Sequence, residues 1–316
     1  MKKRLVAVVV VGVVLLSLVA GMVSVLSGPG GDLARGRGTG TVAVISITGT
    51  IVSGRAAPGI FSVQTGSEEV IARLRRAAED PSVRAVVLRL NSPGGTASGA
   101  QEIAAEVDRL KAGGKKVVAS MGDAAASGAY WIACRADRIV ANPGTLTGSI
   151  GVIMQVQDMQ SLYNKLGIAT RTFKSGPHKD MGSPSRPVTP EEQQIFQGMV
   201  DDIYDQFLQT VAGGRKMDLE RVKSLADGRV FTGRQARELG LVDELGNLQD
   251  AIRVAGRLAG LGDEPRVTDL SPRGLWSGMW GGTALSGWRW RPETQTAIWL
   301  LAPLCLPSGP GNNNIF

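Results

Sequence analysis

The sequence predicts an α/β fold with a parallel sheet, and three observations lead to this prediction. Apolar, β-branched segments alternate with helical segments between residues 42 and 141, as in strands joined by crossover helices. Two predicted strands end in the small and polar stretches "NSPGG" and "DAAASG", at the positions where parallel sheets carry reactive groups. Hydrophobic residues make up 43% of the 316 residues and charged residues 20%, which is a globular composition.

The first half of the chain predicts regular elements in close succession. Residues 42–52 form a β-branched strand that contains a glycine turn, and Ser67 is expected to cap a helix ending near Asp80, because its apolar positions recur at helical spacing. Further strands are predicted at residues 84–90, 115–121 and 137–142, with helices at 97–112 and directly after Ser127.

The second half predicts a long capped helix after a loop-rich stretch. A helix is expected at residues 161–166, a strand at 168–173 and a proline-rich loop at 175–188. Thr189, Pro190 and Glu192 then form the cap, first position and capping box of a long helix. A second capping box is predicted from Thr232 to Gln235. The apolar stripe of the long helix consists of Ile195, Met199, Ile203, Phe207 and Val211.

The first segment predicts a membrane anchor. Leu5 to Leu26 contains no charge, and as a helix it is roughly 33 Å long, enough for a bilayer core of about 30 Å. The preceding "KKR" predicts a cytoplasmic N-terminus, with the remainder outside. A cleaved signal peptide is the alternative, but this apolar run is long and its cleavage sites are poor. The expected organisation is a cytoplasmic stub and anchor (1–26), a glycine-rich linker (27–40), a folded domain (41–262) and a tryptophan-rich tail without an assigned role (263–316).

Charge and cysteine content exclude several classes of protein. The net charge is +7, but no basic stripe with interleaved aromatic residues is present, which argues against nucleic-acid binding. The two cysteines, Cys134 and Cys305, cannot form a disulfide framework, and no cysteine–histidine cluster suggests a metal. Cys134 lies on the apolar helix after Ser127, and we expect it to be a buried free thiol.

Ser127 is the candidate nucleophile, with a helix cap as its ordinary alternative. A serine hydroxyl needs a base within reach and donors for the oxyanion. His178 and Lys179 are adjacent candidate bases, and a lysine can serve only where its pKa falls from about 10.4 to near 7 or 8. Hydroxyls that could orient such a lysine come from Thr145, Thr147 and Ser149, and backbone donors could come from Gly94, Gly95 and Gly128.

Together these segments resemble a known family. "LNSPGG", "ASGAYWIACRADRIVANPGTLTGSIGV", "FKSGPHKDMGSPSRPVTPEE" and "GRVFTGRQARELGLVDELG" are similar to signal peptide peptidase A, the short bacterial form of the protease IV (S49) serine peptidases. The resemblance runs from about Val42 to Leu261. It implies that Ser127 is the nucleophile, Lys179 the general base and Ser149 the residue that orients the lysine. Gly94 or Gly95 with Gly128 would form the oxyanion hole.

The resemblance also implies the architecture and the activity. The expected fold is a crotonase/ClpP-like superhelix of parallel strands with packed helices, preceded by the transmembrane helix. The expected function is a membrane-anchored endopeptidase that degrades cleaved signal peptides, without metal or cofactor, as a homo-oligomeric ring with serine and lysine meeting across subunits. The alternatives are a stomatin-partnered protease of the same clan, a crotonase-like acyl-CoA enzyme, which the extracytoplasmic placement disfavours, and an inactive membrane scaffold.

Overall fold

The computed structural model describes residues 40–56 and 63–271. Within them, eight strands form one sheet in which every pairing but one is parallel. The main path across it is β10 (Arg266–Asp269), β1 (Thr41–Thr48), β4 (Val83–Ser92), β5 (Lys116–Ala126), β6 (Arg138–Ala141) and β9 (Glu244–Leu245). β7 (Leu146–Gly148) pairs with the end of β5, and β8 (Val230–Thr232) pairs antiparallel with β7. The predicted α/β class with a parallel sheet is therefore confirmed.

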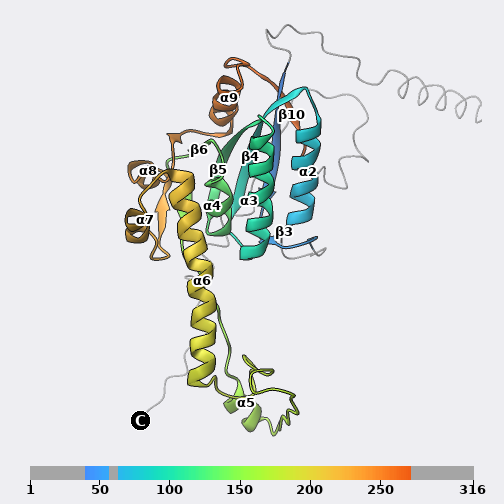
Figure 1. The fold of residues 1–316 in the computed structure, drawn as a ribbon, viewed down its shortest axis with the longest axis vertical. Coiled ribbons are helices and arrows are strands. Elements are labelled where there is room, and N and C mark those ends of the chain that lie inside the picture. The colour runs from blue at the N-terminus through green and yellow to red at the C-terminus, as the bar shows by residue number, and fades with distance from the viewer. Residues whose placement is uncertain (1–39, 57–62, 272–316) are drawn as a thin grey trace, which may run out of the picture. The chain divides into compact units, whose positions relative to one another are not determined.

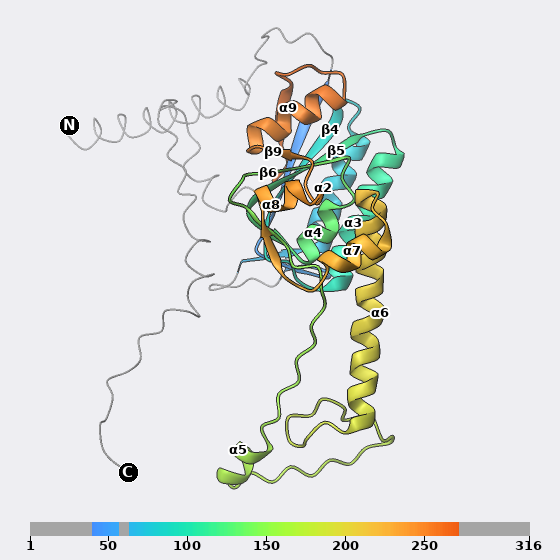
Figure 2. The same ribbon diagram turned by 90° about the vertical axis from the view of Figure 1, so that its left-hand side faces the viewer.

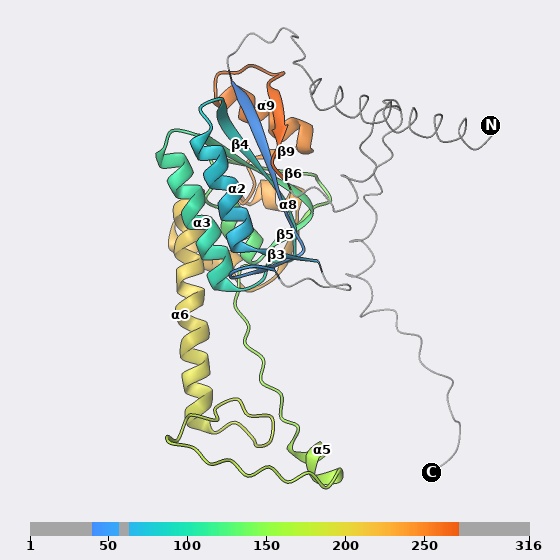
Figure 3. The same cartoon turned by 90° about the vertical axis from the view of Figure 1, so that its right-hand side faces the viewer.

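Helices cover both faces of the sheet. α2 (Ser67–Glu79), α3 (Ala97–Ala112) and α4 (Gly128–Ala133) pack on one face, where Leu88 and Ile103 belong to the larger apolar core; Figure 3 shows α2 and α3 side by side on this face. α9 (Leu248–Leu258) packs on the other face against Val87 and Val118. Alternate residues of the central strands thus enter different cores, which explains why these strands are apolar almost throughout.

The long helix α6 (Pro190–Arg215) begins as predicted: Thr189 accepts a hydrogen bond from the backbone N–H of Glu192, and Pro190 is the first helical residue. Its buried apolar side chains lie in its C-terminal part, where Phe207 stacks on Trp131 with ring centroids 4.7 Å apart. Its N-terminal part extends away from the sheet, and α5 (Gln160–Lys165) lies at that far end (Figures 1 and 2). We call residues 151–200 the arm. The remaining helices, α7 (Leu219–Leu225) and α8 (Gly233–Glu238), lie beyond α6 in the sequence.

A second, two-stranded parallel sheet joins β2 (Thr50–Val52) to β3 (Gln64–Gly66). β2 follows β1 after Gly49, whose φ of 76° makes the predicted glycine turn. The backbone of Ile51 in β2 is hydrogen-bonded on both sides to the chain after β4: its N–H donates to Gly94 O (2.8 Å), and its carbonyl accepts from Thr96 N (2.9 Å). This small sheet therefore fixes the loop that follows β4.

Two local predictions were wrong. Gly66, not Ser67, is the N-cap of α2, because the Ser67 hydroxyl is occupied in accepting a hydrogen bond from Gly54 N and donating one to Glu102. Residues 168–173 form no strand. Their side chains are exposed, with Phe173 at 94%, so this segment has neither the pairing partner nor the buried face that a strand requires.

Several sequence predictions concern residues outside the described ranges. The anchor at Leu5–Leu26, most of the linker, Cys305 and the tail after residue 271 lie there. Among the helices of the described part, none combines the length and apolar character needed to cross a bilayer. The sheet continues through β10 to Asp269, within the segment that the sequence analysis assigned to the tail.

Candidate active site

Ser127 lies at the junction where β5 ends and α4 begins. Its backbone has φ 53° and ψ −122°, a region that residues other than glycine rarely adopt and that costs about 1–3 kcal/mol. Two hydrogen bonds hold it there, from Ser127 N to Gly148 O and from Trp131 N to Ser127 O, both 2.9 Å. Although Ser127 occupies the N-cap position, its side chain makes no capping bond. The residue as a whole is half-buried.

The Pro-Gly-Gly loop after β4 packs directly against Ser127. Gly94 has φ 109°, and a Cβ built on it would lie 2.8 Å from the Cβ of Ser127 and 2.9 Å from the N of Gly128. A Cβ on Gly95 would lie 1.9 Å from Ile51 O. Since real side chains do not tolerate such contacts, both glycines are required by space, and Gly94 also by its φ.

Two glycines, Gly95 and Gly128, are neighbours close to the serine. Gly128 N–H is in the first turn of α4, where it has no acceptor within the helix. A Cβ built on Gly128 would lie 3.4 Å from the N of Gly95, so the two glycines are neighbours. By contrast, Gly94 N–H donates to the hydroxyl of Ser92 at 3.0 Å.

Ser149 is brought next to Ser127 by strand register. β5 and β7 pair in parallel with Ala126 opposite Gly148, so the two serines are the next residues at neighbouring strand ends. Ser149 also has a positive φ, 50°, and its N–H donates to Arg229 O at 2.9 Å. The other predicted hydroxyls serve the backbone: those of Thr145 and Thr147 are buried and donate to Gly122 O (2.6 Å) and Ala125 O (2.7 Å).

Lys179 lies on a separate part of the chain. It belongs to the loop between α5 and α6 and is exposed, and this loop lies near the end of α6 that is farther from α4 (Figure 2). The neighbouring His178 has its Nε2 3.6 Å from Glu191 Oε1. One chain therefore brings together Ser127, Ser149 and the glycines, but it leaves both candidate bases on the arm.

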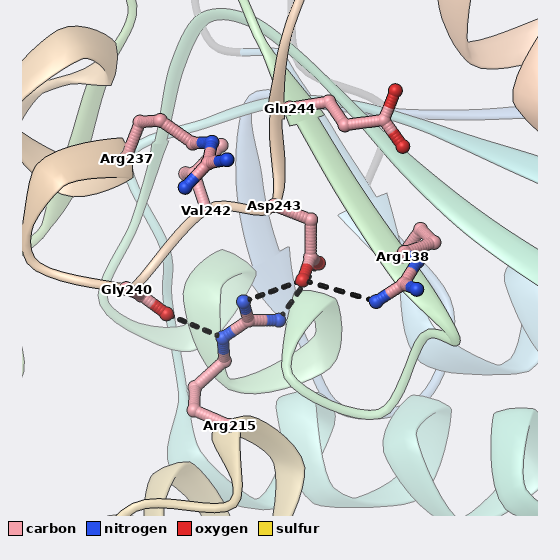
Figure 4. Close-up of a pocket in the computed structure, with 7 residues that line it drawn as sticks. All are labelled: Arg138, Arg215, Arg237, Gly240, Val242, Asp243 and Glu244. Atoms are coloured by element: carbon pink, nitrogen blue, oxygen red, sulfur yellow. Dashed lines mark hydrogen bonds and ion pairs between the residues drawn. The ribbon is translucent and has the colours of Figure 1, made fainter.

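A solvent-open cavity of about 350 Å³ lies away from Ser127. Figure 4 shows its centre, where Arg215 donates to both carboxylate oxygens of Asp243 at 2.9 Å and to Gly240 O at 3.0 Å, with Arg138 3.5 Å from Asp243. Arg138 begins β6 opposite Val118 of β5, whereas Ser127 follows the last residue of β5. Burial alone would raise the pKa of Asp243, but the hydrogen bonds and charge of Arg215, the bond from Ile139 N–H and the charge of Arg138 together lower that pKa. This cavity surrounds a structural ion pair that ties the end of α6 to the sheet.

Cys134 is a buried free thiol, as predicted. Burial raises its pKa to about 12, so the thiol stays protonated and unreactive at neutral pH.

Comparison with known proteins identifies the family of this chain. The profile of Peptidase family S49 matches residues 109–262. A Synechocystis protein named as a protease is 44% identical over 70% of this chain and 75% of its own length. A protein of Enterococcus faecium named as a signal peptide peptidase is 34% identical over 81% of this chain and 75% of its own length. Protease 4 of Salmonella typhi is 39% identical over 73% of this chain, but only 38% of its own length is covered.

Among solved structures, a ClpP1 mutant from Listeria monocytogenes is similar with a TM-score of 0.44 and 15% identity, over 66% of this chain and 94% of that one. The sequence relatives define the class of protein: it is a serine peptidase, a hydrolase of peptide bonds. More particularly, the chain belongs to peptidase family S49.

Proposed function

We propose that this serine peptidase is a membrane-anchored endopeptidase that degrades cleaved signal peptides at the cytoplasmic membrane, with its catalytic domain on the outer side. Ser127 is the nucleophile, Lys179 the general base and Ser149 the residue that orients the lysine. The observation that carries the catalytic proposal is the setting of Ser127: a strained backbone, a hydroxyl without a capping bond, and closely packed glycines beside it.

The chemistry follows from these positions. Lys179 Nζ takes the proton of Ser127 Oγ as the oxygen attacks the scissile carbonyl, and the oxyanion accepts hydrogen bonds from Gly95 and Gly128 N–H. Breaking the C–N bond leaves an acyl-enzyme, and the lysine returns the proton to the departing amine. The same lysine then activates the water that hydrolyses the ester. Gly95 is favoured over Gly94 as the donor because Gly94 N–H already bonds to Ser92.

We propose further that the site forms between copies of the chain in a ring. Support comes from the arm, which extends away from the sheet (Figure 1) and includes the loop that carries Lys179. It exposes apolar side chains, including Ile153 at 85% and Phe173 at 94%, and it contains an open groove of about 600 Å³. A second copy that covered the arm would bury this surface. It would also desolvate the lysine, which favours the neutral amine that a base requires. The groove is lined by Met154, Val156, Val188, Pro190, Gln193, Gln194, Phe196, Gln197 and Val200.

Membrane anchoring rests on the uncharged run from Leu5 to Leu26. The full chain should stay in the membrane fraction after alkaline carbonate extraction. The double variant Val10→Arg/Val14→Arg should be released, because each arginine at the centre of a span costs about 2.5–3.5 kcal/mol. Release of the unaltered chain by carbonate would contradict the anchor.

Labelling with a fluorophosphonate probe tests the catalytic proposal. The intact protein should be labelled covalently at Ser127, Ser127→Ala should not be labelled, and Lys179→Ala should be labelled far more slowly. The absence of labelling, or labelling that persists in Ser127→Ala, would contradict the assignment of Ser127 as the nucleophile. Cleavage of a synthetic signal peptide by the purified protein alone would distinguish the proposal from a stomatin-partnered protease.

A further inference from the structure

The loop that carries Lys179 is held by charged groups instead of a hydrophobic core. Between Ile150 and Glu192 no residue is fully buried, and the first buried side chain after Ile150 is the carboxylate of Glu192, 2% exposed. Such a loop has few apolar contacts to hold its shape. Its conformation must therefore come from polar contacts, and these converge on Arg186.

Arg186 joins the lysine loop to the first turn of α6. It donates to both oxygens of Asp180, at 2.8 and 3.1 Å, and to Asp180 O at 3.3 Å. It also donates to both oxygens of Glu192, one at 2.8 Å. Glu192 is itself fixed by the backbone N–H of Thr189 at 3.0 Å. A planar guanidinium can make two such bidentate contacts, whereas an ammonium cannot.

The same network includes Asp180, the residue that follows Lys179 in the sequence. Asp180 is only 13% exposed and accepts from Lys174 Nζ (2.7 Å) as well as from Arg186. The bonds from Arg186, then those from Lys174, hold the pKa of Asp180 well below its ordinary value. Those from Arg186 and from the backbone of Thr189 lower the pKa of Glu192 to about 2. The side-chain partners of Asp180 are therefore Lys174 and Arg186.

The balance of charge matters for a lysine base. A free carboxylate next to an amine favours the protonated, inactive form. The charged groups around the loop are Lys174, Asp180 and Arg186, with Glu192 beneath them and Glu191 facing His178. Asp180 forms ion pairs with Lys174 and Arg186, and Glu192 forms one with Arg186. Within this network, no carboxylate near Lys179 in the sequence is therefore without a cationic partner.

We propose that Arg186 is a positioning residue for the catalytic lysine: by joining Asp180 to Glu192 it holds the Lys179 loop on α6 and keeps the adjacent carboxylate from stabilising the lysine's charge. This inference rests on the proposed role of Lys179 as general base.

The test measures kcat and KM from pH 6 to 10 for the full-length protein and its variants. Arg186→Ala should lower kcat about 100-fold, the size of loss that a misplaced catalytic group causes, with little change in KM. It should also move the midpoint of the pH–kcat profile up by about one unit, because Asp180 is released. Arg186→Lys should recover part of kcat, and Arg253→Ala, which removes an exposed ion pair on α9, should behave as the unaltered protein.

Asp180→Asn separates the two effects and guards against misfolding of Arg186→Ala. Asp180→Asn should lower kcat, because the contact between Arg186 and residue 180 that holds the loop is weakened, but it should not shift the pH–kcat profile. The double variant Arg186→Ala/Asp180→Asn should have the midpoint of its pH–kcat profile at the original pH. Unchanged kcat in Asp180→Asn, or an unchanged profile in a folded Arg186→Ala, would overturn the inference. If Lys179→Ala itself stayed active, the proposed function would fail instead.

Discussion

At the scale of single residues, the backbone decides what Ser127 can do. Its positive φ places the side chain at the turn between strand and helix without a capping bond. Gly94 approaches so closely that a Cβ built on it would lie 2.9 Å from the N of Gly128. Strain of this kind persists only where the surroundings enforce it, and here the hydrogen bonds to Gly148 and Trp131 do so.

Gly94→Ala tests this close approach. The new methyl group would lie 2.8 Å from the Cβ of Ser127 at a φ of 109°, so we expect kcat/KM to fall by about 100-fold or more through misplacement of the nucleophile. Peptide hydrolysis and fluorophosphonate labelling both report the loss. Gly144→Ala is the matched control, because a Cβ there meets nothing within 4 Å; equal activity of the two variants would contradict the geometry.

The choice between the two candidate bases is tested by Lys179→Ala and His178→Ala. The first variant should abolish peptidase activity, because the proposed general base of Ser127 would be missing. The second should keep most of it, since His178 lies beside Glu191. Activity should rise toward alkaline pH as the amine loses its proton. If His178→Ala were the inactive variant, the assignment of the base would be wrong.

At the scale of elements, the chain is tied together where strands end and helices begin. The salt bridge between Arg215 at the end of α6 and Asp243 before β9 is largely buried, at 8% and 17% exposure. Asp243 also accepts from Ile139 N at 2.7 Å. This pair fixes α6 to the sheet, and α6 in turn carries the arm.

Asp243→Asn should destabilise the fold by about 3 kcal/mol, because Arg215 is left buried without its partner. The pKa of Asp243 is lowered in the folded state, so its contribution is present above the ordinary aspartate value and is lost as pH falls through the folded pKa. The difference in unfolding free energy should therefore be constant from pH 5 to 8 and shrink below about pH 4. Urea titrations measure it, and Glu220→Gln, in an exposed pair, should show little change. An equal effect of both variants would contradict this account.

The sequence predicted these elements well where the signal is local. The capping residues Thr189, Pro190 and Glu192 identified the start of α6. Ser127 lies near the Gly94–Gly95 loop, as expected for two segments that follow the ends of parallel strands. The strand predicted at residues 168–173 does not form, because a strand also needs a neighbouring strand to pair with, and the local sequence does not show whether one is present. Ser67 does not cap the helix, because its hydroxyl instead accepts a hydrogen bond from Gly54 N and donates one to Glu102. The contacts of Arg186 with Asp180 and Glu192 were not predicted. These residues lie in a loop and in the first turn of a helix, where sequence spacing does not indicate which side chains meet.

At the scale of the whole molecule, the peptidase class and the S49 family are established, whereas the complete site is a proposal that involves more than one chain. The sheet and its helices bring together the proposed nucleophile and the proposed oxyanion donors, and the arm carries the proposed base. The exposed apolar groups of the arm are the surface that a neighbouring copy would cover. A single sequence could suggest the dyad but not the distance between its members within one chain.

Co-expression of Ser127→Ala with Lys179→Ala tests the shared site most directly. Each variant alone should be inactive. Particles that contain both should recover about a quarter of the normal activity, because random mixing places an intact serine beside an intact lysine at that fraction of head-to-tail contacts. Peptide hydrolysis by particles purified through a tag on each chain measures it. Mixed particles as inactive as either variant alone would contradict the account.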